Sequence, residues 1–177
     1  VFHNFINNKI DLAISGNNFD EYSYFNIDEQ KTKGISSIIN FYYKKTNTKF
    51  GISYIGRYNE LNNDYNIEKY QFSLDYNFST SFNIGNNTKI NIFYKKTGEI
   101  INYLIDNNTI RETISDAYNI MDISLNQKAY NNKIIISIGA KNLFNITDVS
   151  RSISDTVHSN SDNLMSIGYG RSFFMEL

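Results

Sequence analysis

Alternation of apolar and polar residues with a period of two is the feature that most constrains how this chain folds. The clearest case is a run in which five apolar residues are separated by polar ones: Tyr70, Phe72, Leu74, Tyr76 and Phe78. Similar runs lie near residues 89–95, 121–126, 134–141 and 165–177. Successive side chains of a β-strand point to opposite faces, so this pattern predicts strands with one apolar and one polar face. No competing helical pattern extends over three turns, and we therefore expect an all-β fold.

The composition agrees with long strands and excludes several functional classes. The 177 residues contain no proline, a residue that cannot donate a hydrogen bond within a sheet. The aromatic residues are all tyrosine (14) and phenylalanine (13), which favour pleated surfaces. The 17 basic and 18 acidic residues nearly cancel, which argues against a nucleic-acid partner bound through bulk positive charge. The absence of cysteine excludes disulfides and thiolate metal sites.

The spacing of the patterned segments predicts eight strands and two kinds of connection. We expect strands at about 1–15, 22–43, 49–59, 67–79, 87–98, 117–128, 133–143 and 164–177. Short links follow every second strand, near 44–48, 80–86 and 129–132. Longer polar loops lie between the others, near 16–21, 60–66, 98–116 and 144–163.

Short turns on one side and long loops on the other are typical of outer-membrane barrels. Strands of ten or more residues are long enough to cross a bilayer at a tilt. The mean hydropathy of −0.43 is compatible with this location, because only alternate residues meet lipid. We therefore predict that residues 1–177 form one segment of an antiparallel, up-and-down transmembrane β-barrel.

Three segments near the C-terminus resemble motifs of TonB-dependent outer-membrane receptors. Residues 139–148 resemble the "GxKNLFN-x-TD" segment, residues 168–177 resemble the closing "GYGRxFFxxL" strand, and residues 116–122 resemble "DAYxxxD". The residues that carry the first two motifs are Gly139, Lys141, Asn142, Leu143, Phe144, Asn145, Gly170 and Arg171. The pair His158-Ser159, ahead of the last strand, resembles the sequences of receptors from Bacteroidota-like Gram-negative bacteria. The order of these motifs and their spacing to the C-terminus make the resemblance specific.

The resemblance implies a 22-stranded barrel filled by an N-terminal plug domain. Such a receptor imports a scarce nutrient (a siderophore, haem, cobalamin, a glycan or a peptide) with energy from TonB. This chain carries about eight strands and neither a plug nor a TonB box, so it corresponds to the last third of such a barrel. The implied location is the bacterial outer membrane, with the C-terminus on the periplasmic side.

A self-contained eight-stranded outer-membrane barrel, acting as a structural anchor or adhesin, is the alternative. A closed barrel of that size must fill its lumen with its own side chains. The small inward residues Ser137, Gly139, Ser166 and Gly168 favour the larger barrel instead.

The resemblance also implies a set of partners. These are outer-membrane lipid, the remaining receptor strands and the plug domain, TonB through the N-terminal part, and the barrel assembly machinery. Phe173, Met175 and Leu177 would form the C-terminal assembly signal, although the family usually ends on an aromatic residue where this chain has Leu177. A surface lipoprotein is a further partner to consider, and no nucleic acid is expected.

Candidate ligand contacts lie in the late loop, at Arg151, Asp155 and His158. A hydrolase built from Ser159, His158 and Asp155 is disfavoured, because three residues of one polar loop rarely reach catalytic geometry. We therefore expect neither enzymatic activity nor a cofactor.

Two other polar features are also weak site candidates. His3 has no second ligand at metal-binding spacing. Asp106, Glu112 and Asp116 have the oxygen ligands of a hard-cation site, but a solvated loop is the preferred interpretation.

The predicted barrel places aromatic residues at both membrane interfaces. Near the short turns these are Tyr43, Phe78 and Tyr130, and near the loops they are Tyr58, Tyr70 and Phe144. Arg171 falls on the lipid-facing register of the last strand, where a charge at mid-depth is costly. Two explanations stay open, a position near the interface and a local irregularity of the strand.

Overall fold

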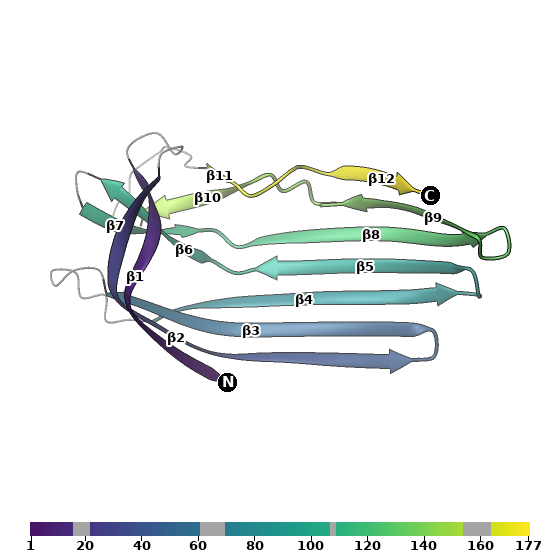
Figure 1. The fold of residues 1–177 in the computed structure, drawn as a ribbon, viewed down its shortest axis with the longest axis horizontal. Coiled ribbons are helices and arrows are strands. Elements are labelled where there is room, and N and C mark those ends of the chain that lie inside the picture. The colour runs from purple at the N-terminus through teal and green to yellow at the C-terminus, as the bar shows by residue number, and fades with distance from the viewer. Residues whose placement is uncertain (16–21, 61–69, 107–108, 154–163) are drawn as a thin grey trace.

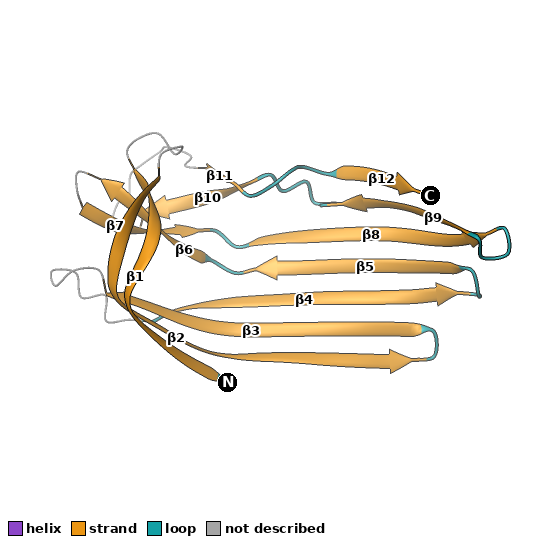
Figure 2. Cartoon of the chain, in the orientation of Figure 1, coloured by secondary structure: helices purple, strands orange, loops and turns teal. Residues whose placement is uncertain are grey.

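The computed structural model describes residues 1–15, 22–60, 70–106, 109–153 and 164–177, and all regular structure in these ranges is β-strand (Figures 1 and 2). The strands are β1 (Phe2–Ser15), β2 (Tyr22–Tyr43), β3 (Thr46–Glu60), β4 (Gln71–Ile84), β5 (Thr88–Thr97), β6 (Ile100–Asp106), β7 (Thr109–Ser115), β8 (Tyr118–Ala129), β9 (Ile134–Lys141), β10 (Asp148–Ile153), β11 (Leu164–Ser166) and β12 (Ser172–Glu176). The all-β prediction is confirmed for this part of the chain.

The twelve strands form eight long strands, because four of the long strands are each divided into two by one interruption. The interruptions separate β5 from β6, β7 from β8, β9 from β10 and β11 from β12. Each long strand pairs antiparallel with its neighbours in sequence, in the order β1-β2-β3-β4-β5-β8-β9-β12, continued by β6-β7-β10-β11 beyond the interruptions. The predicted set of eight antiparallel strands is confirmed, and the sheet that they form in the described part of the chain is open, not a closed barrel.

The connections differ from the prediction at the long loops. The segment 98–116, expected to be a loop, is largely the hairpin of β6 and β7, in which Asp106 pairs with Thr109. The segment 144–163, also expected to be a loop, contains β10, whose Arg151 pairs with Ser115 of β7. The long strands therefore extend further toward the loop end than the alternation indicates.

Two of the three short turns are shorter than predicted, and all three contain left-handed backbone. The turn from β2 to β3 is only residues 44–45, with Lys44 at φ 49°, and the turn from β4 to β5 contains Gly85 at φ 64°. Tyr130 begins the turn from β8 to β9 at φ 46°. Because β4 runs on to Ile84, Phe78 lies well inside the strand, and its predicted position beside a short turn is wrong.

The strand register gives the sheet two distinct faces. On the apolar face, Phe50 pairs with Phe78, which pairs with Tyr94 in the next strand. The intervening residues form the polar face, where Asn77 pairs with Lys95. The predicted alternation is thus confirmed across strand pairs as well as along each strand.

Burial is concentrated at the loop end, where the β1–β2 hairpin bends across the long strands (Figure 1). Ile14 and Ser15 of β1 pair in parallel with Leu104 and Ile105 of β6. Ile27 is fully buried and Phe25 is 8% exposed. Away from this end the apolar face is uncovered. Among the described residues, β12 ends the hydrogen-bonded order, and β1 pairs only with β2 over residues 2–13.

Candidate functional site

Asn142 organises the interruption between β9 and β10. Its amide Nδ2 donates to the carbonyl oxygens of Ile146 (2.8 Å) and Tyr169 (3.0 Å), and its Oδ1 accepts from the backbone N–H of Ile146 (3.1 Å). The residue is buried and has a φ of 51°, a left-handed conformation that asparagine tolerates better than most residues. Its own backbone N–H donates to Asp122 Oδ1 at 2.8 Å.

A second asparagine of the motif holds the interruption between β11 and β12. Asn145 Oδ1 accepts from the backbone N–H of Arg171 at 2.8 Å. At Gly170, a Cβ atom would lie 2.8 Å from the same oxygen, so glycine allows this close approach. The Arg171 guanidinium donates through Nε to the carbonyl oxygen of Leu143 at 3.0 Å. Arg171 thus lies in an irregular segment, which agrees with the second explanation of its register.

These two segments of the sequence motifs therefore form a joint between the last three long strands. We call this joint, which consists of residues 142–147 and 167–171, the asparagine joint. Leu143 N–H donates to Met121 O of β8, and Ile167 N–H donates to Thr147 O. The ring of Phe144 lies edge-on to Tyr94, with centroids 6.4 Å apart. The side chains of Asn142, Asn145 and Arg171 all bond backbone groups, and these bonds hold the ends of the strands together.

The apolar face carries aromatic rings near both of its ends. Near the loops, Tyr58 and Tyr70 have ring centroids 5.8 Å apart, and Lys33 Nζ lies 3.8 Å from the centroid of Tyr70. Near the short turns, Phe41 stacks against Tyr43 with centroids 6.3 Å apart. Tyrosine and lysine combine an apolar body with a polar end, and such residues suit a boundary between apolar and aqueous surroundings.

The polar face carries a shallow hollow at β5, β8, β9 and β12. Its volume is about 190 Å³, and its lining includes Phe93, Asp122, Lys141 and Phe174. The Phe174 ring lies over Gly139, where a Cβ would come within 2.6 Å of the ring, and Lys141 Nζ is 5.6 Å from the ring centroid. The hollow thus places two aromatic rings beside a carboxylate and an ammonium group on the polar face.

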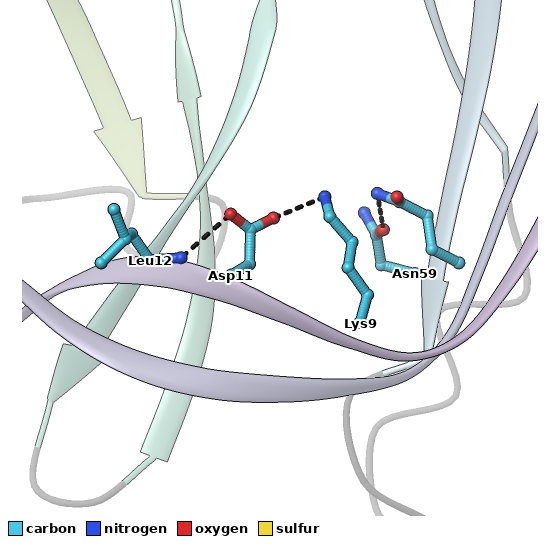
Figure 3. A network of polar contacts seen from close by, with 5 residues as sticks. Lys9, Asp11, Leu12 and Asn59 are labelled. Carbon is cyan, nitrogen blue, oxygen red and sulfur yellow. Dashed lines mark hydrogen bonds and ion pairs between the residues drawn. The ribbon is translucent and has the colours of Figure 1, made fainter.

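Three polar contacts lie at the loop end (Figure 3). Lys9 Nζ lies 2.7 Å from Asp11 Oδ2, and Asp11 Oδ1 accepts from the backbone N–H of Leu12 at 2.9 Å. Gln30 Nε2 donates to Asn59 Oδ1 at 2.9 Å, and both of these residues are buried. The Gln30–Asn59 pair satisfies polar groups where the bent hairpin removes them from solvent.

The structure does not assemble the predicted ligand contacts into one site. Arg151 is half-buried within β10 instead of lying in a loop, while Asp155 and His158 fall outside the described residues. Lys141, Asn142, Phe144, Asn145 and Arg171 do come together at the asparagine joint and beside it. Phe173, Met175 and Leu177 are exposed at the free edge strand β12 and just after it, with 77%, 68% and 88% of their surfaces accessible.

No group of acidic, histidine or cysteine residues within the described ranges has the geometry of a metal site. Asp116 is exposed, and the side chains of Asp106 and Glu112 lie outside the described residues. Among the described residues, no helix is long and apolar enough to span a membrane.

Two features were not predicted from the sequence. They are the buried Gln30–Asn59 pair and the bend of the β1–β2 hairpin, here called the arm, which buries Ile27. The pair has no local signature, because the two residues lie in different strands and are aligned only by the register of β2 and β3. The sequence does carry a short signal for the hairpin, because the apolar Phe25 and Ile27 alternate with polar residues. In the structure, the buried positions change parity between Ile27 and Gln30. This shift occurs opposite Asn8, which has a φ of 52° and is skipped by the pairing register.

Comparison with known protein families, with curated proteins and with solved structures gave no significant match to this chain.

Proposed function

We propose that this chain forms part of the wall of an outer-membrane β-barrel, as the C-terminal portion of a TonB-dependent receptor. The observation that carries the proposal is the uncovered apolar face of a sheet whose other face is polar. Exposed side chains on this face include Ile39 at 60%, Phe41 at 58% and Met175 at 68%. A continuous exposed apolar surface of this kind marks an interaction site, and a wall with lipid on one side provides the matching environment.

The height of the apolar face fits a bilayer. In β4 the face begins at Phe72, whose ring stacks on Tyr54 among the aromatic residues near the loops, and from Leu74 to Ile84 it spans ten further residue steps along the strand. At about 3.3 Å per residue this is about 33 Å, and a strand tilt of about 40° reduces it to about 25 Å across the membrane. Outer-membrane barrels have an apolar band of about that height.

The two sheet edges support a wall that continues beyond these eight strands. Backbone groups at an open edge in lipid find no water, and each unsatisfied group costs several kcal/mol. The outer edges of β1 and β12 have no strand partner in the described part of the chain over most of their lengths. Further strands would satisfy these groups, as the remaining strands of a large receptor do.

The transport role rests on the resemblance of the C-terminal motifs, whose residues form the asparagine joint. In this proposal the long connections face outward and contribute to binding a scarce nutrient, with the late loop carrying Asp155 and His158. The rest of the receptor supplies the plug domain and the contact with TonB. Phe173, Met175 and Leu177 serve as the C-terminal signal for the barrel assembly machinery, which their exposure at a free edge would allow.

Spin-label scanning of β4 tests the wall directly. The chain has no cysteine, so single cysteines at residues 72–84 introduce one label each. In membranes, oxygen accessibility should peak at apolar-face positions such as Phe78, with a period of two and a maximum in the middle of the strand. At neighbouring polar-face positions such as Asn77, oxygen accessibility should be lower than at the apolar-face positions on either side. Accessibility to a water-soluble nickel complex that is equal on both faces at mid-strand would refute the proposal.

A further inference from the structure

The short turns concentrate positive charge at one end of the sheet. The three turns, residues 44–45, 85–87 and 130–133, contain Lys44, Lys45 and Lys133 and no acidic residue. The two residues on either side of each turn add Lys89 and Lys128 and again no acid. Loop-end lysines differ, since Lys31 Nζ lies 2.7 Å from Glu29 Oε2.

Two of these lysines lie over tyrosine rings at the turns. Lys44 Nζ is 5.1 Å from the centroid of the Tyr43 ring, and Lys133 Nζ is 5.9 Å from that of Tyr130. Both lysines are exposed, and neither has an ion pair among the described residues. A ring contact attracts the ammonium group without using its N–H donors, which stay available to an external anion.

The adjacent surface is the end of the exposed apolar face. Tyr43 is 57% exposed, Ile84 48% and Ile134 43%, and all three flank short turns. An exposed lysine next to such a surface lies at the boundary between hydrocarbon and water, where lipid phosphate groups are located. On the proposed function, with short turns facing the periplasm, this boundary belongs to the phospholipid leaflet.

We propose that Lys44 and Lys133 form a lipid-contact rim that binds the phosphates of anionic phospholipids in the periplasmic leaflet. This inference rests on the proposed membrane wall. The two turns are separated by about four strand spacings, or about 19 Å, which exceeds the screening length of about 8 Å at physiological salt. Each lysine therefore attracts its own headgroup.

Lys89 and Lys128 provide an internal control at the same end of the sheet. Both lie on the polar face, where they line a groove of about 450 Å³ with Asn83, Asn126 and Ser137. Their charges are as close to the turns as those of the rim, but they face away from the apolar surface. The proposal assigns lipid selectivity to Lys44 and Lys133 and not to these two.

The test measures which lipid gathers beside one turn. The full protein that carries this chain, with Asn131→Cys as its single labelled cysteine, is placed in vesicles of phosphatidylcholine with a minor fraction of phosphatidylglycerol. Quenching of a dye at residue 131 by nitroxide-labelled phosphatidylglycerol is compared with quenching by nitroxide-labelled phosphatidylcholine. A lysine near an anionic surface favours the anionic lipid by about fivefold, so the selectivity ratio should be about five.

The variants and salt decide the outcome. Lys133→Gln should reduce the ratio to about one, Lys128→Gln should leave it unchanged, and 1 M salt should remove it in the parent. A ratio near one in the parent protein, or an equal loss in Lys133→Gln and Lys128→Gln, would overturn the rim. If the label is not quenched by either lipid while β4 fails the spin-label test, the membrane wall itself is wrong. If both labelled lipids quench the dye equally, only the proposed binding of anionic lipid by the lysines is overturned, and the membrane wall is not.

Discussion

Replacing Asn142 with alanine should destabilise the C-terminal strands more than any other single substitution in the asparagine joint. The side chain makes three hydrogen bonds, to the carbonyl oxygens of Ile146 and Tyr169 and from the N–H of Ile146. At about 1 kcal/mol each their loss costs about 3 kcal/mol. Alanine at a φ of 51° adds about 1 kcal/mol of backbone strain. We expect a total loss of about 4 kcal/mol in the free energy of unfolding.

Asn131→Ala is the matched control. Asn131 has a φ of 54°, is exposed in the turn before β9, and makes no side-chain hydrogen bond to another described residue. The same substitution there carries only the strain of about 1 kcal/mol. Asn142→Gly should recover about that amount relative to Asn142→Ala, because glycine tolerates the left-handed backbone.

Urea unfolding in lipid vesicles, followed by the gel-mobility difference between folded and unfolded protein, measures these changes. The difference between Asn142→Ala and Asn131→Ala should be about 3 kcal/mol. Equal losses at the two positions would refute the reasoning, because the hydrogen bonds of the joint would then contribute nothing beyond backbone conformation.

Three further predictions follow from single contacts. Gly139→Val should cost about 1–3 kcal/mol in the same unfolding assay, because its Cβ would meet an aromatic ring at 2.6 Å; wild-type stability would contradict this packing. Phe78→Arg should cost at least about 2–4 kcal/mol at mid-bilayer, while Asn77→Arg should be nearly neutral, and equal costs would contradict the assignment of faces. A double-mutant cycle on Gln30 and Asn59, each changed to alanine, should give a coupling of about 1 kcal/mol, and additive losses would show the bond to be unimportant.

The sequence is most informative where one face of a strand differs from the other. From Gln71 to Ile84 and from Tyr118 to Ala129 the alternation predicts the strands and their apolar faces, because side-chain direction has a strict period of two. At Ile100–Asp106 and Thr109–Ser115 it fails, and a loop is predicted where a hairpin exists. These strands lie at the loop end, where apolar and polar residues are not sorted between two faces.

The interruptions of the last strands depend on contacts that no local pattern contains. Asn142 belongs to a motif visible in the sequence, but its bond to Tyr169 O links residues 27 positions apart. The irregular position of Arg171 follows from the same joint, since its backbone N–H is held by Asn145 Oδ1. The motif thus indicates which residues form the interruptions, and the register of the strands determines which hydrogen bonds these residues make. The candidate ligand residues share no such framework, because Arg151 lies in a strand and the other two are outside the described residues.

The most direct test of the central claim is the intact mass of the native species that contains this chain after extraction from outer membranes, together with sequencing of its N-terminus. The proposal predicts a species about three to four times the 20.6 kDa of this chain, or a tightly bound second fragment that carries the plug. A lone 20.6 kDa species that changes gel mobility on heating would contradict it and would establish a self-contained eight-stranded barrel instead.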